Sequence, residues 1–271
     1  MTPVRRRLDA ELVRRGIVDS RQQAAAAVAA HRVLVGGAAA TKASRMVSVA
    51  DPLVLLGPGP RFVSRGGEKL DAALERFGIG VEGRRAVDAG ASTGGFVDCL
   101  LQRGASRVVA IDAGRGQLDA RLRADPRVAL HEGFNVRSAG PALLGADGPA
   151  DLLTADLSFI SLRTVAPALA GMVRAGGDLV VLVKPQFEAG RADASRHKGV
   201  IKDPLVWRRT LLEVASALEA AGTGIMGAMA SPIRGSAGNV EFFLHAVTGA
   251  TPAAGLEGLT DAAVESVAEE A

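Results

Sequence analysis

The feature of this sequence that most constrains its fold is a regular alternation of apolar runs and helix-like segments beginning at Arg84. Short runs rich in Val, Ile and Leu are separated by longer stretches with apolar residues at helical spacing. Such alternation is typical of βαβ units, in which helices cover a parallel sheet. The runs at 223–230 and 239–247 have no helix between them, so one of those strands must be antiparallel. The sequence therefore predicts a doubly wound α/β fold with a hairpin-like end.

The individual elements are predicted from residue type, spacing and capping signals. Strands are expected at 84–90, 106–114, 127–133, 151–159, 178–185, 223–230 and 239–247. Helices are expected at 94–104, 116–125, 161–177 and 203–222. Asp203 followed by Pro204 marks the start of the last helix, because Asp caps exposed N–H groups and Pro fits the first turn.

A small basic unit precedes this region. Residues 7–56 are expected to form two helices, the second capped by Asp19 or Ser20, and three short strands. Residues 1–70 carry 12 Lys and Arg against 5 Asp and Glu, whereas the rest carry 20 against 24. This asymmetry is expected where one part of a chain binds a polyanion, although an arginine-rich solvated surface would look the same.

Other features narrow the class of protein. The single cysteine, Cys99, excludes a disulfide framework and a cysteine-ligated zinc site, and no metal is expected. No secretory signal or membrane-spanning run is visible, so we expect a cytoplasmic protein with no membrane partner. Residues 248–271 contain five acidic and no basic residues and are expected to form a mobile or loosely packed helix.

The loop after the first strand of the alternating region indicates the ligand. It reads Gly90-Ala91-Ser92-Thr93-Gly94-Gly95 and opens a helix, which is where such sheets bind ligands. It matches neither the dinucleotide fingerprint nor the phosphate-binding P-loop. Asp88 at the mouth of the loop would repel a pyrophosphate. S-adenosylmethionine has no phosphate and carries an ammonium and a sulfonium, so the sequence predicts a site for that cofactor.

Two later strand ends complete this prediction. Asp112 lies 22 residues after Gly90, close to the offset at which an acid accepts hydrogen bonds from ribose hydroxyls. Asn135 follows the third strand and is placed to contact the adenine edge. A glycine turn with an Asp cap is the structural alternative.

Four charged residues indicate the reaction. Asp156 and Lys184 end neighbouring strands, Glu241 lies in the last strand, and Lys69 precedes the sheet. Buried lysines require partners, and two lysines with two carboxylates form a balanced cluster. A ribose 2′-hydroxyl is a poor nucleophile that needs a base or a strongly cationic environment. We expect Lys184 to accept its proton and Asp156 and Glu241 to orient the lysines.

The chain resembles the TlyA (haemolysin A) family of rRNA 2′-O-ribose methyltransferases. The stretches that carry the resemblance extend over nearly the whole chain except its tail: RLDAELVRRG, SRQQA, FVSRGGEKL, DAGASTGGF, DAGRGQL, ADLSFISL, VKPQFE and GNVEFFL. The resemblance implies a Lys-Asp-Lys-Glu tetrad at Lys69, Asp156, Lys184 and Glu241. It also implies methylation of cytidine riboses in small-subunit rRNA, large-subunit rRNA or both.

The resemblance divides the chain into four parts. Residues 1–59 are expected to form an RNA-binding domain of the ribosomal small-subunit protein four type, and 60–66 a linker. Residues 67–250 are expected to form a Rossmann-like methyltransferase domain with a seven-stranded, mostly parallel sheet, followed by an acidic tail at 251–271. The partner is then rRNA in assembled ribosomal subunits, bound by a monomer.

The expected sites are assigned by ligand. The cofactor residues are Asp88, Gly90, Ser92, Thr93, Gly94, Gly95, Asp112, Asn135, Asp156 and Leu157. The RNA-binding residues are Arg5, Arg7, Arg21, Lys42, Arg65, Arg115 and Phe159. The basic side chains among them are suited to phosphate contacts.

Three other readings are possible. A non-catalytic RNA-binding assembly factor could keep a vestigial methyltransferase fold, but an intact set of four compatible charges argues against it. A pore-forming haemolysin is disfavoured because the sequence has no signal, span or strongly amphipathic apolar helix. A base methyltransferase would favour an aromatic-polar pocket after the fourth strand, where this chain has DLSF.

Overall fold

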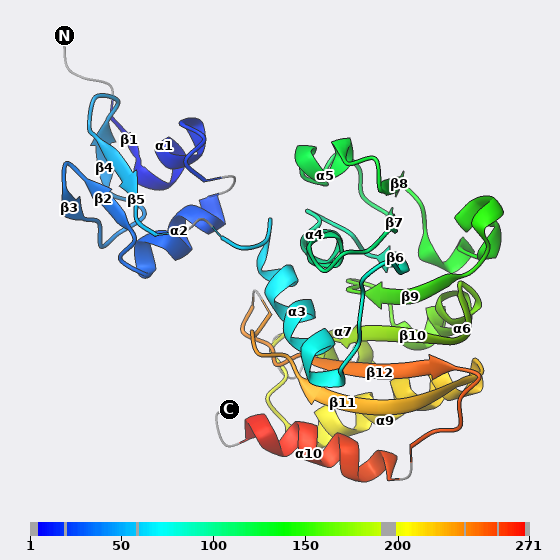
Figure 1. The fold of residues 1–271 in the computed structure, drawn as a ribbon. Coiled ribbons are helices and arrows are strands. Elements are labelled where there is room, and N and C mark those ends of the chain that lie inside the picture. Colours follow the sequence, from blue (N-terminus) through cyan, green and yellow to red (C-terminus); the bar gives the residue numbers. More distant parts are fainter. Residues whose placement is uncertain are drawn as a thin grey trace. The chain divides into compact units, whose positions relative to one another are not determined.

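The structure, a computed structural model, describes residues 5–18, 21–57, 60–190, 199–235, 237–253 and 255–268. The chain forms two compact units, Met1–Ser64 and Arg65–Ala271 (Figure 1). The residues expected to cap the second helix, Asp19 and Ser20, lie outside the described residues.

The smaller unit combines two helices with short antiparallel strands. Its elements are β1 (Arg5–Arg7), α1 (Leu8–Arg14), α2 (Arg21–Ala29), β2 (Val33–Val35), β3 (Ala38–Ala39), β4 (Met46–Ser48) and β5 (Leu53–Leu55). β1 pairs with β4, and β2 pairs with both β3 and β5. Leu8 and Leu12 of α1 and Val28 of α2 share a buried core with Val33 and Val47.

The larger unit is an alternating α/β structure. Its first half contains α3 (Arg65–Phe77), β6 (Arg85–Ala89), α4 (Gly95–Gln102), β7 (Arg107–Asp112), α5 (Ala120–Ala124), β8 (Val128–Glu132) and the 3₁₀ helices η1 (Val136–Ser138) and η2 (Pro141–Asp147). Its second half contains β9 (Ala150–Ala155), α6 (Leu162–Gly171), β10 (Val173–Val183), α7 (Pro185–Glu188), α9 (Pro204–Ala220), β11 (Thr223–Ala230), β12 (Phe242–Thr248) and α10 (Leu256–Ala268).

The strands of the larger unit form one sheet. Within the described residues it has seven strands in the order β11-β12-β10-β9-β6-β7-β8. β12 runs antiparallel to both of its neighbours, and the pairs from β10 to β8 are parallel. The predicted mostly parallel sheet with an antiparallel end is confirmed. The chain order reverses between β6 and β9, so this is the switch point at which such sheets bind ligands.

Helices cover both faces of this sheet. α3 and α4 pack together on one face, and α6 and α9 cover the other (Figure 1). The second face holds a core in which Trp207 and Leu211 of α9 pack with Leu153, Val181 and neighbouring strand residues. α9 begins as predicted, because Asp203 accepts a hydrogen bond from the Leu205 N–H and Pro204 occupies its first turn.

Several boundaries differ from the prediction. The helix expected at 161–177 ends at Gly171, and β10 already begins at Val173. The register of β10 against β9 shifts between Val173 and Asp178, and Gly176 in that stretch has a φ of +72°. This irregular glycine-containing segment disguised the start of the strand. In the region expected as a helix at 116–125, only α5 is helical, with Asp119 as its cap.

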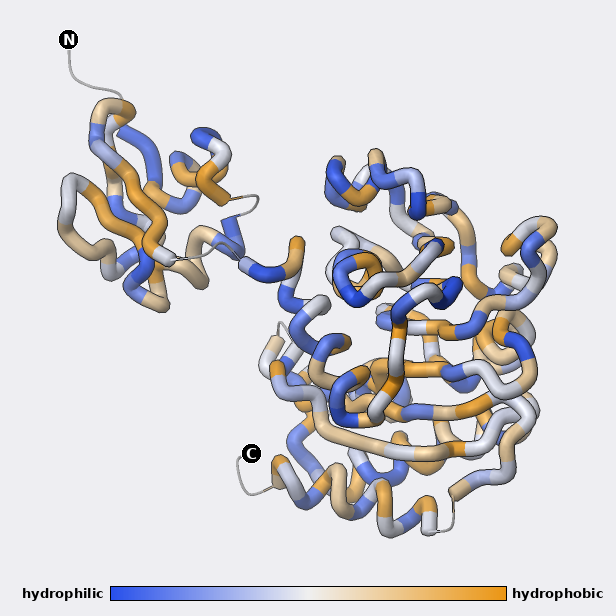
Figure 2. The backbone as a smooth tube through the Cα atoms, in the orientation of Figure 1, coloured by the Kyte–Doolittle hydropathy of each residue, from blue (hydrophilic) through white to orange (hydrophobic). Residues whose placement is uncertain are grey.

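Two helices pack more firmly than their sequences suggested. α3 begins at Arg65, inside the expected linker, and it buries Leu70, Ala73 and Leu74 at helical spacing despite two glycines in its first turn. α10 occupies the tail that was expected to be loosely packed. Figure 2 shows hydrophobic and hydrophilic residues alternating along it. Its buried face contains Thr260, Ala263 and Val264, and it packs against α9 and β11.

Candidate active site

A cavity of about 760 Å³ opens at the carboxyl ends of the parallel strands. Its volume lies in the ~300–1,000 Å³ range of small-molecule sites. Its wall comes from the turns after β6, β7, β8 and β9, and its lining residues include Gly90, Ser92, Asp112, Asn135, Arg137, Asp156, Leu157 and Phe159. The charged groups of this lining are two carboxylates and one guanidinium.

The glycine loop follows β6 in a conformation that suits close packing. Gly90 has a φ of +92°, and a Cβ placed on it would lie 2.3 Å from the backbone oxygen of Asp156. Any larger residue would therefore push apart the turns after β6 and β9. Gly94, with a φ of +99°, occupies the N-cap of α4. The two glycines allow a tight strand-to-helix turn beside the cavity.

Asp112 connects the turns after β6 and β7. Its Oδ2 accepts a hydrogen bond from the Ser92 N–H at 2.7 Å, and its Oδ1 accepts one from the Gly114 N–H at 2.6 Å. It lines the cavity at the carboxyl end of β7. A carboxylate has about four lone-pair sites, so it retains acceptor capacity for ligand hydroxyls. The side chain thus shapes the loop and faces the ligand space.

Asn135 lies in the turn after β8, the third of the four turns that line the cavity. Its Oδ1 accepts a hydrogen bond from the Arg137 N–H at 3.0 Å, which caps η1. This bond orients the amide group, whose nitrogen remains a potential donor to an acceptor on a ligand.

Asp88 differs from the prediction, because it does not lie at the mouth of the loop. It is a fully buried residue within β6 and is absent from the cavity lining. Its Oδ1 accepts a hydrogen bond from Thr154 Oγ1 at 2.8 Å, and its Oδ2 has no partner among the described residues. Burial, assisted by the nearby charges of Asp156 and Asp112, raises its pKa to about 7. The argument that Asp88 repels phosphate at the loop mouth is therefore wrong; Asp112 and Asp156 supply the acidic wall.

The expected catalytic residues form two ion pairs. Lys184 Nζ lies 2.5 Å from Asp156 Oδ1 and donates a hydrogen bond to Ser158 Oγ at 3.2 Å. Lys69 Nζ lies 2.6 Å from Glu241 Oε2, and both of these side chains are buried. The sequence predicted that Glu241 lies within the last strand. In the structure it immediately precedes β12, which begins at Phe242.

Strand register places the two pairs at the same edge of the sheet. Val183 pairs with Phe242, so Lys184 and Glu241 occupy the next positions on two hydrogen-bonded strands. Asp156 follows β9, which pairs with β10 on its other side. α3 brings Lys69 to Glu241. Four charges from distant parts of the sequence thereby converge at the carboxyl end of β10.

Not every expected cofactor residue reaches the cavity. Gly90, Ser92, Asp112, Asn135, Asp156 and Leu157 line it, whereas Asp88, Thr93, Gly94 and Gly95 do not. The last three belong to the turn and first residue of α4 and shape the loop from behind. Sequence reasoning missed Gln117, Phe134, Arg137, Ser158, Ser161 and Thr164, which also line the cavity. Most of them lie within a few residues of a strand end, and that position was the available signal.

The expected RNA contacts lie at the surface of their own units. In the smaller unit these are Arg5, Arg7, Arg21 and Lys42, and in the larger unit Arg65, Arg115 and Phe159, all exposed. Phe159 is 92% exposed and also borders the cavity. Its ring lies 5.2 Å from that of Phe187, centroid to centroid.

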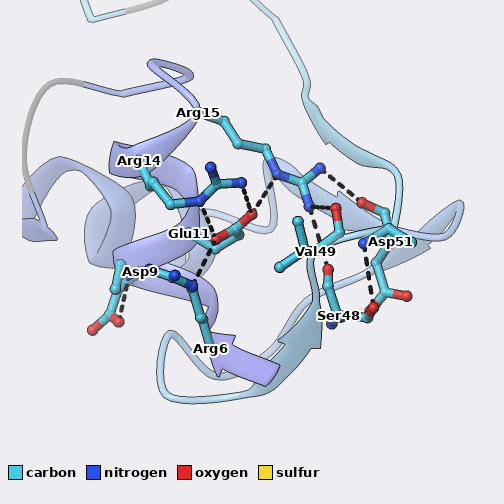
Figure 3. Close-up of polar contacts among 10 residues, drawn as sticks. Arg6, Asp9, Glu11, Arg14, Arg15, Ser48, Val49 and Asp51 are labelled. Carbon is cyan, nitrogen blue, oxygen red and sulfur yellow. Dashed lines mark hydrogen bonds and ion pairs between the residues drawn. The ribbon is translucent and has the colours of Figure 1, made fainter. Parts of the chain in front are cut away.

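Buried carboxylates hold several arginines of the smaller unit. Asp9 forms ion pairs with Arg7 at 2.9 Å and Arg21 at 3.0 Å. Figure 3 shows Glu11 accepting hydrogen bonds from Arg14 and Arg15, with Arg15 extending to the backbone oxygens of Ser48, Val49 and Asp51. The paired guanidinium groups lower the pKa of Glu11 to about 2. α1 is thus joined electrostatically to the turn after β4.

The described part of the chain has no helix with the length and apolar character needed to cross a bilayer.

Comparison with known families divides the chain in the same way as its fold. Residues 62–248 match the FtsJ-like methyltransferase family, and residues 6–53 match the S4 domain. These two matches leave only short segments of the chain uncovered.

Similar proteins match two thirds or more of the chain. The 16S/23S rRNA (cytidine-2′-O)-methyltransferase TlyA of Mycobacterium tuberculosis is 48% identical over 98% of both chains. The 23S rRNA (cytidine-2′-O)-methyltransferase TlyA of Campylobacter jejuni is 34% identical over 68% of this chain and 70% of its own. A solved structure from Streptococcus thermophilus, provisionally described as a hemolysin, is 35% identical with a TM-score of 0.76, covering 100% of this chain and 99% of its own.

Proposed function

The chain belongs to the TlyA family, and from that premise we propose that it transfers a methyl group from S-adenosylmethionine to the 2′-hydroxyl of cytidine in rRNA. The observation that carries the proposal is the position of Lys184. It directly follows β10 at the edge of the sheet where the cavity opens, and its amine lies near the carboxylate of Asp156 and the hydroxyl of Ser158. Asp156 and Ser158 themselves line the cavity.

The cavity suits S-adenosylmethionine by its charge and shape. Asp112 and Asp156 face a space in which a cofactor with an ammonium and a sulfonium would be bound. The backbone loop at Gly90 offers a close approach, and Asp112 offers acceptors for ribose hydroxyls. Asn135 and Leu157 would contact the adenine. The cofactor, when bound, supplies an electrophilic methyl group on its sulfonium.

The protein groups then act on the attacking hydroxyl. Lys184, once it has released a proton to become a neutral amine, would accept the 2′-hydroxyl proton while the ribose oxygen attacks the methyl group that the cofactor would supply, with the cofactor's sulfur as the leaving group. Asp156 stabilises the resulting ammonium by direct ion pairing. Ser158 limits the rotation of the Lys184 side chain. The buried Lys69–Glu241 pair adds a positive charge and its counter-charge at the same edge.

RNA binding is assigned to both units. The smaller unit, of which residues 6–53 match the S4 domain, carries the exposed Arg5, Arg7, Arg21 and Lys42, which suit sequence-independent phosphate contacts. In the methyltransferase unit, Arg65, Arg115 and Phe159 are exposed. An aromatic ring at the cavity edge suits stacking with an unpaired base.

The substrate range is proposed from the relatives. The Mycobacterium tuberculosis relative is named for both 16S and 23S rRNA, and it aligns with nearly the whole chain. We therefore expect both ribosomal subunits to be substrates. Separate small and large subunits should be incubated with the protein and methyl-labelled S-adenosylmethionine, and the modified nucleotide then mapped. Label in a base, or no label in either subunit, would contradict the proposal.

A further inference from the structure

The turn after β9 holds an aromatic residue in a strained conformation. Phe159 has a φ of +64° although it is neither Gly nor Asn, and the residue is 92% exposed. A left-handed backbone at such a residue costs about 1–3 kcal/mol and persists only where neighbouring contacts enforce it. The same turn carries Ser158, whose hydroxyl contacts Lys184. Something outside the turn must therefore fix its conformation.

Glu188 is the side chain that does so. It is 2% exposed and lies at the end of α7, four residues after Lys184. Its Oε2 accepts a hydrogen bond from Ser161 Oγ at 2.5 Å, and its Oε1 accepts one from the Leu162 N–H at 2.8 Å. Arg163 donates to the backbone oxygen of Glu188 at 2.9 Å. Every one of these partners lies directly after the strained turn.

The two segments are thus joined at both ends. At one end, Asp156 after β9 forms an ion pair with Lys184 after β10. At the other end, Glu188 of α7 accepts hydrogen bonds from Ser161 and Leu162 at the start of α6. Between these two connections the rings of Phe159 and Phe187 lie 5.2 Å apart. The turn at 157–160 is therefore clamped against the segment that carries Lys184.

The acid that binds the start of α6 does not come from α6 itself, which is unusual for a helix N-terminus. A capping acid normally comes from the third residue of the same helix. In α6 that position is Thr164, which lines the cavity, and the acid that accepts from the Leu162 N–H is instead Glu188, 26 positions after Leu162. Burial raises the pKa of Glu188, so retaining a carboxylate here carries a cost. The contacts link the helix start specifically to the Lys184 segment.

We propose that Glu188 is a positioning residue for methyl transfer. It fixes the turn 157–160 so that Ser158 holds the Lys184 amine and Phe159 stays at the cavity edge. This inference rests on the proposed function, and Glu188 is not itself part of the cavity lining, which it contacts through the Ser161 hydroxyl.

The test compares Glu188→Ala with two matched variants of the full-length protein. Glu188→Gln keeps an oxygen for the Leu162 N–H and an amide N–H for Ser161 Oγ. Glu213→Ala removes the half-buried acid that pairs with Arg163 at 2.6 Å, and Glu213 has no contact with the turn itself. For each protein, kcat and KM on ribosomal subunits are measured across pH 6–9, and hydrogen exchange is followed over residues 157–164.

Glu188→Ala should lower kcat by at least about tenfold, since displacing a reacting group by about 1 Å can cost about 10²-fold. The pH profile of kcat should also shift, because Lys184 loses its fixed surroundings, whereas a smaller folded fraction would only scale the profile. Exchange over 157–164 should accelerate. Glu188→Gln should stay within about threefold of the unchanged protein, as one modest hydrogen-bond change allows. Glu213→Ala should match the unchanged protein.

Wild-type kcat and an unmoved pH profile in folded Glu188→Ala would overturn the inference. So would a Glu213→Ala variant as impaired as Glu188→Ala. If Glu188→Ala does not fold, Glu188→Asp decides in its place, because it keeps the carboxylate but withdraws it from the Ser161 hydroxyl and the Leu162 N–H. An inactive wild-type protein would instead refute the proposed function. In that case the exchange rates at 157–164 still decide whether Glu188 fixes the turn.

Discussion

Lys69 and Glu241 form a buried ion pair, with Nζ 2.6 Å from Oε2, although 172 residues separate them in the sequence. Lys69 comes from α3 and Glu241 from the residue before β12. Neither charge has enough contact with water to be stable alone. The pair therefore connects α3, at the start of the methyltransferase unit, to β12, the last strand in the sequence, beside Lys184.

Removing one member of this pair should destabilise the protein strongly. Glu241→Ala leaves the Lys69 ammonium buried without a partner, and the expected loss in the free energy of unfolding is about 3–5 kcal/mol. Urea denaturation followed by circular dichroism measures it.

The double variant Lys69→Met with Glu241→Leu is the matched control. Apolar side chains of similar size in place of a buried ion pair are often neutral or stabilising. We expect the double variant to regain most of the stability and none of the methyl transfer. Full activity in the double variant would exclude the pair from the reaction.

Replacing Lys184 by Ala should abolish methyl transfer while cofactor affinity stays within about fivefold, or about 1 kcal/mol. The reason is that Lys184 lies at the strand end but is not part of the cavity lining. Single-turnover assays with labelled methyl groups and calorimetry with S-adenosylmethionine give the two quantities.

Lys184→Arg separates two roles of that side chain. Arginine keeps a positive charge beside Asp156 but cannot accept a proton near neutral pH. An inactive Lys184→Arg variant supports proton transfer to Lys184. Retained turnover would show that charge alone is required.

Asp112 should control cofactor affinity. Asp112→Ala removes acceptors for ribose hydroxyls and also frees the N–H groups of Ser92 and Gly114. We expect binding to weaken by about 1–3 kcal/mol, the range for charged hydrogen bonds. Asp112→Asn keeps one oxygen and should lose less. Equal calorimetric affinities for all three proteins would remove Asp112 from the site.

The sequence predicted the parts of this site that are local. A strand, a glycine loop and a helix follow one another at 84–104, and their spacing to Asp112 is a property of consecutive residues. The convergence of Lys69 and Glu241 is not local. It depends on α3, whose two initial glycines hid its apolar stripe, and on the register between β10 and β12. Charge balance and the family resemblance suggested the cluster; backbone pairing explains it.

Asp88 shows where spacing misleads. An acid two residues before a glycine loop was placed at its mouth, but side chains alternate along a strand. Asp88 in β6 points to Thr154 of the neighbouring strand β9, not into the cavity. Glu188 shows the opposite case, since nothing within its own segment reveals that it caps a helix 26 residues earlier.

The buried position of Asp88 predicts a specific pH dependence of stability. Its pKa rises from 3.8 to about 7 on folding, chiefly through burial. The folded state therefore favours the protonated carboxyl, and its stabilising contribution is lost as pH rises from about 4 through 7. The slope is about 1.4 kcal/mol per pH unit between those values. The side chain of Asp88→Asn is uncharged at every pH, so this variant should lack the part of the pH dependence of unfolding free energy that comes from Asp88.

Denaturation at pH 5, 6, 7 and 8 tests this expectation. The difference in unfolding free energy between Asp88→Asn and the unchanged protein should shift in favour of Asn as pH rises. Other titrating groups are shared by both proteins and cancel in that difference. Parallel stability profiles would mean that Asp88 ionises in the folded state as it does in water.

The smaller unit should supply RNA affinity but no chemistry. In the full chain, replacing Arg5 and Arg21 by Ala should flatten the slope of log affinity against log salt by somewhat more than about one unit, because each phosphate contact contributes about 0.7–0.9.

A truncated protein beginning at Pro60 retains α3, the glycine loop and Asp112, and should still bind S-adenosylmethionine. It should fail to methylate intact subunits, because the phosphate contacts of the smaller unit are lost. Lys69 and Glu241 remain in the truncated protein, so the failure would not come from a missing catalytic residue. Calorimetry first establishes that the truncated protein binds cofactor, so that lost activity reports lost docking. Near-normal methylation by this protein would show that the basic unit is not needed to hold the ribose in place.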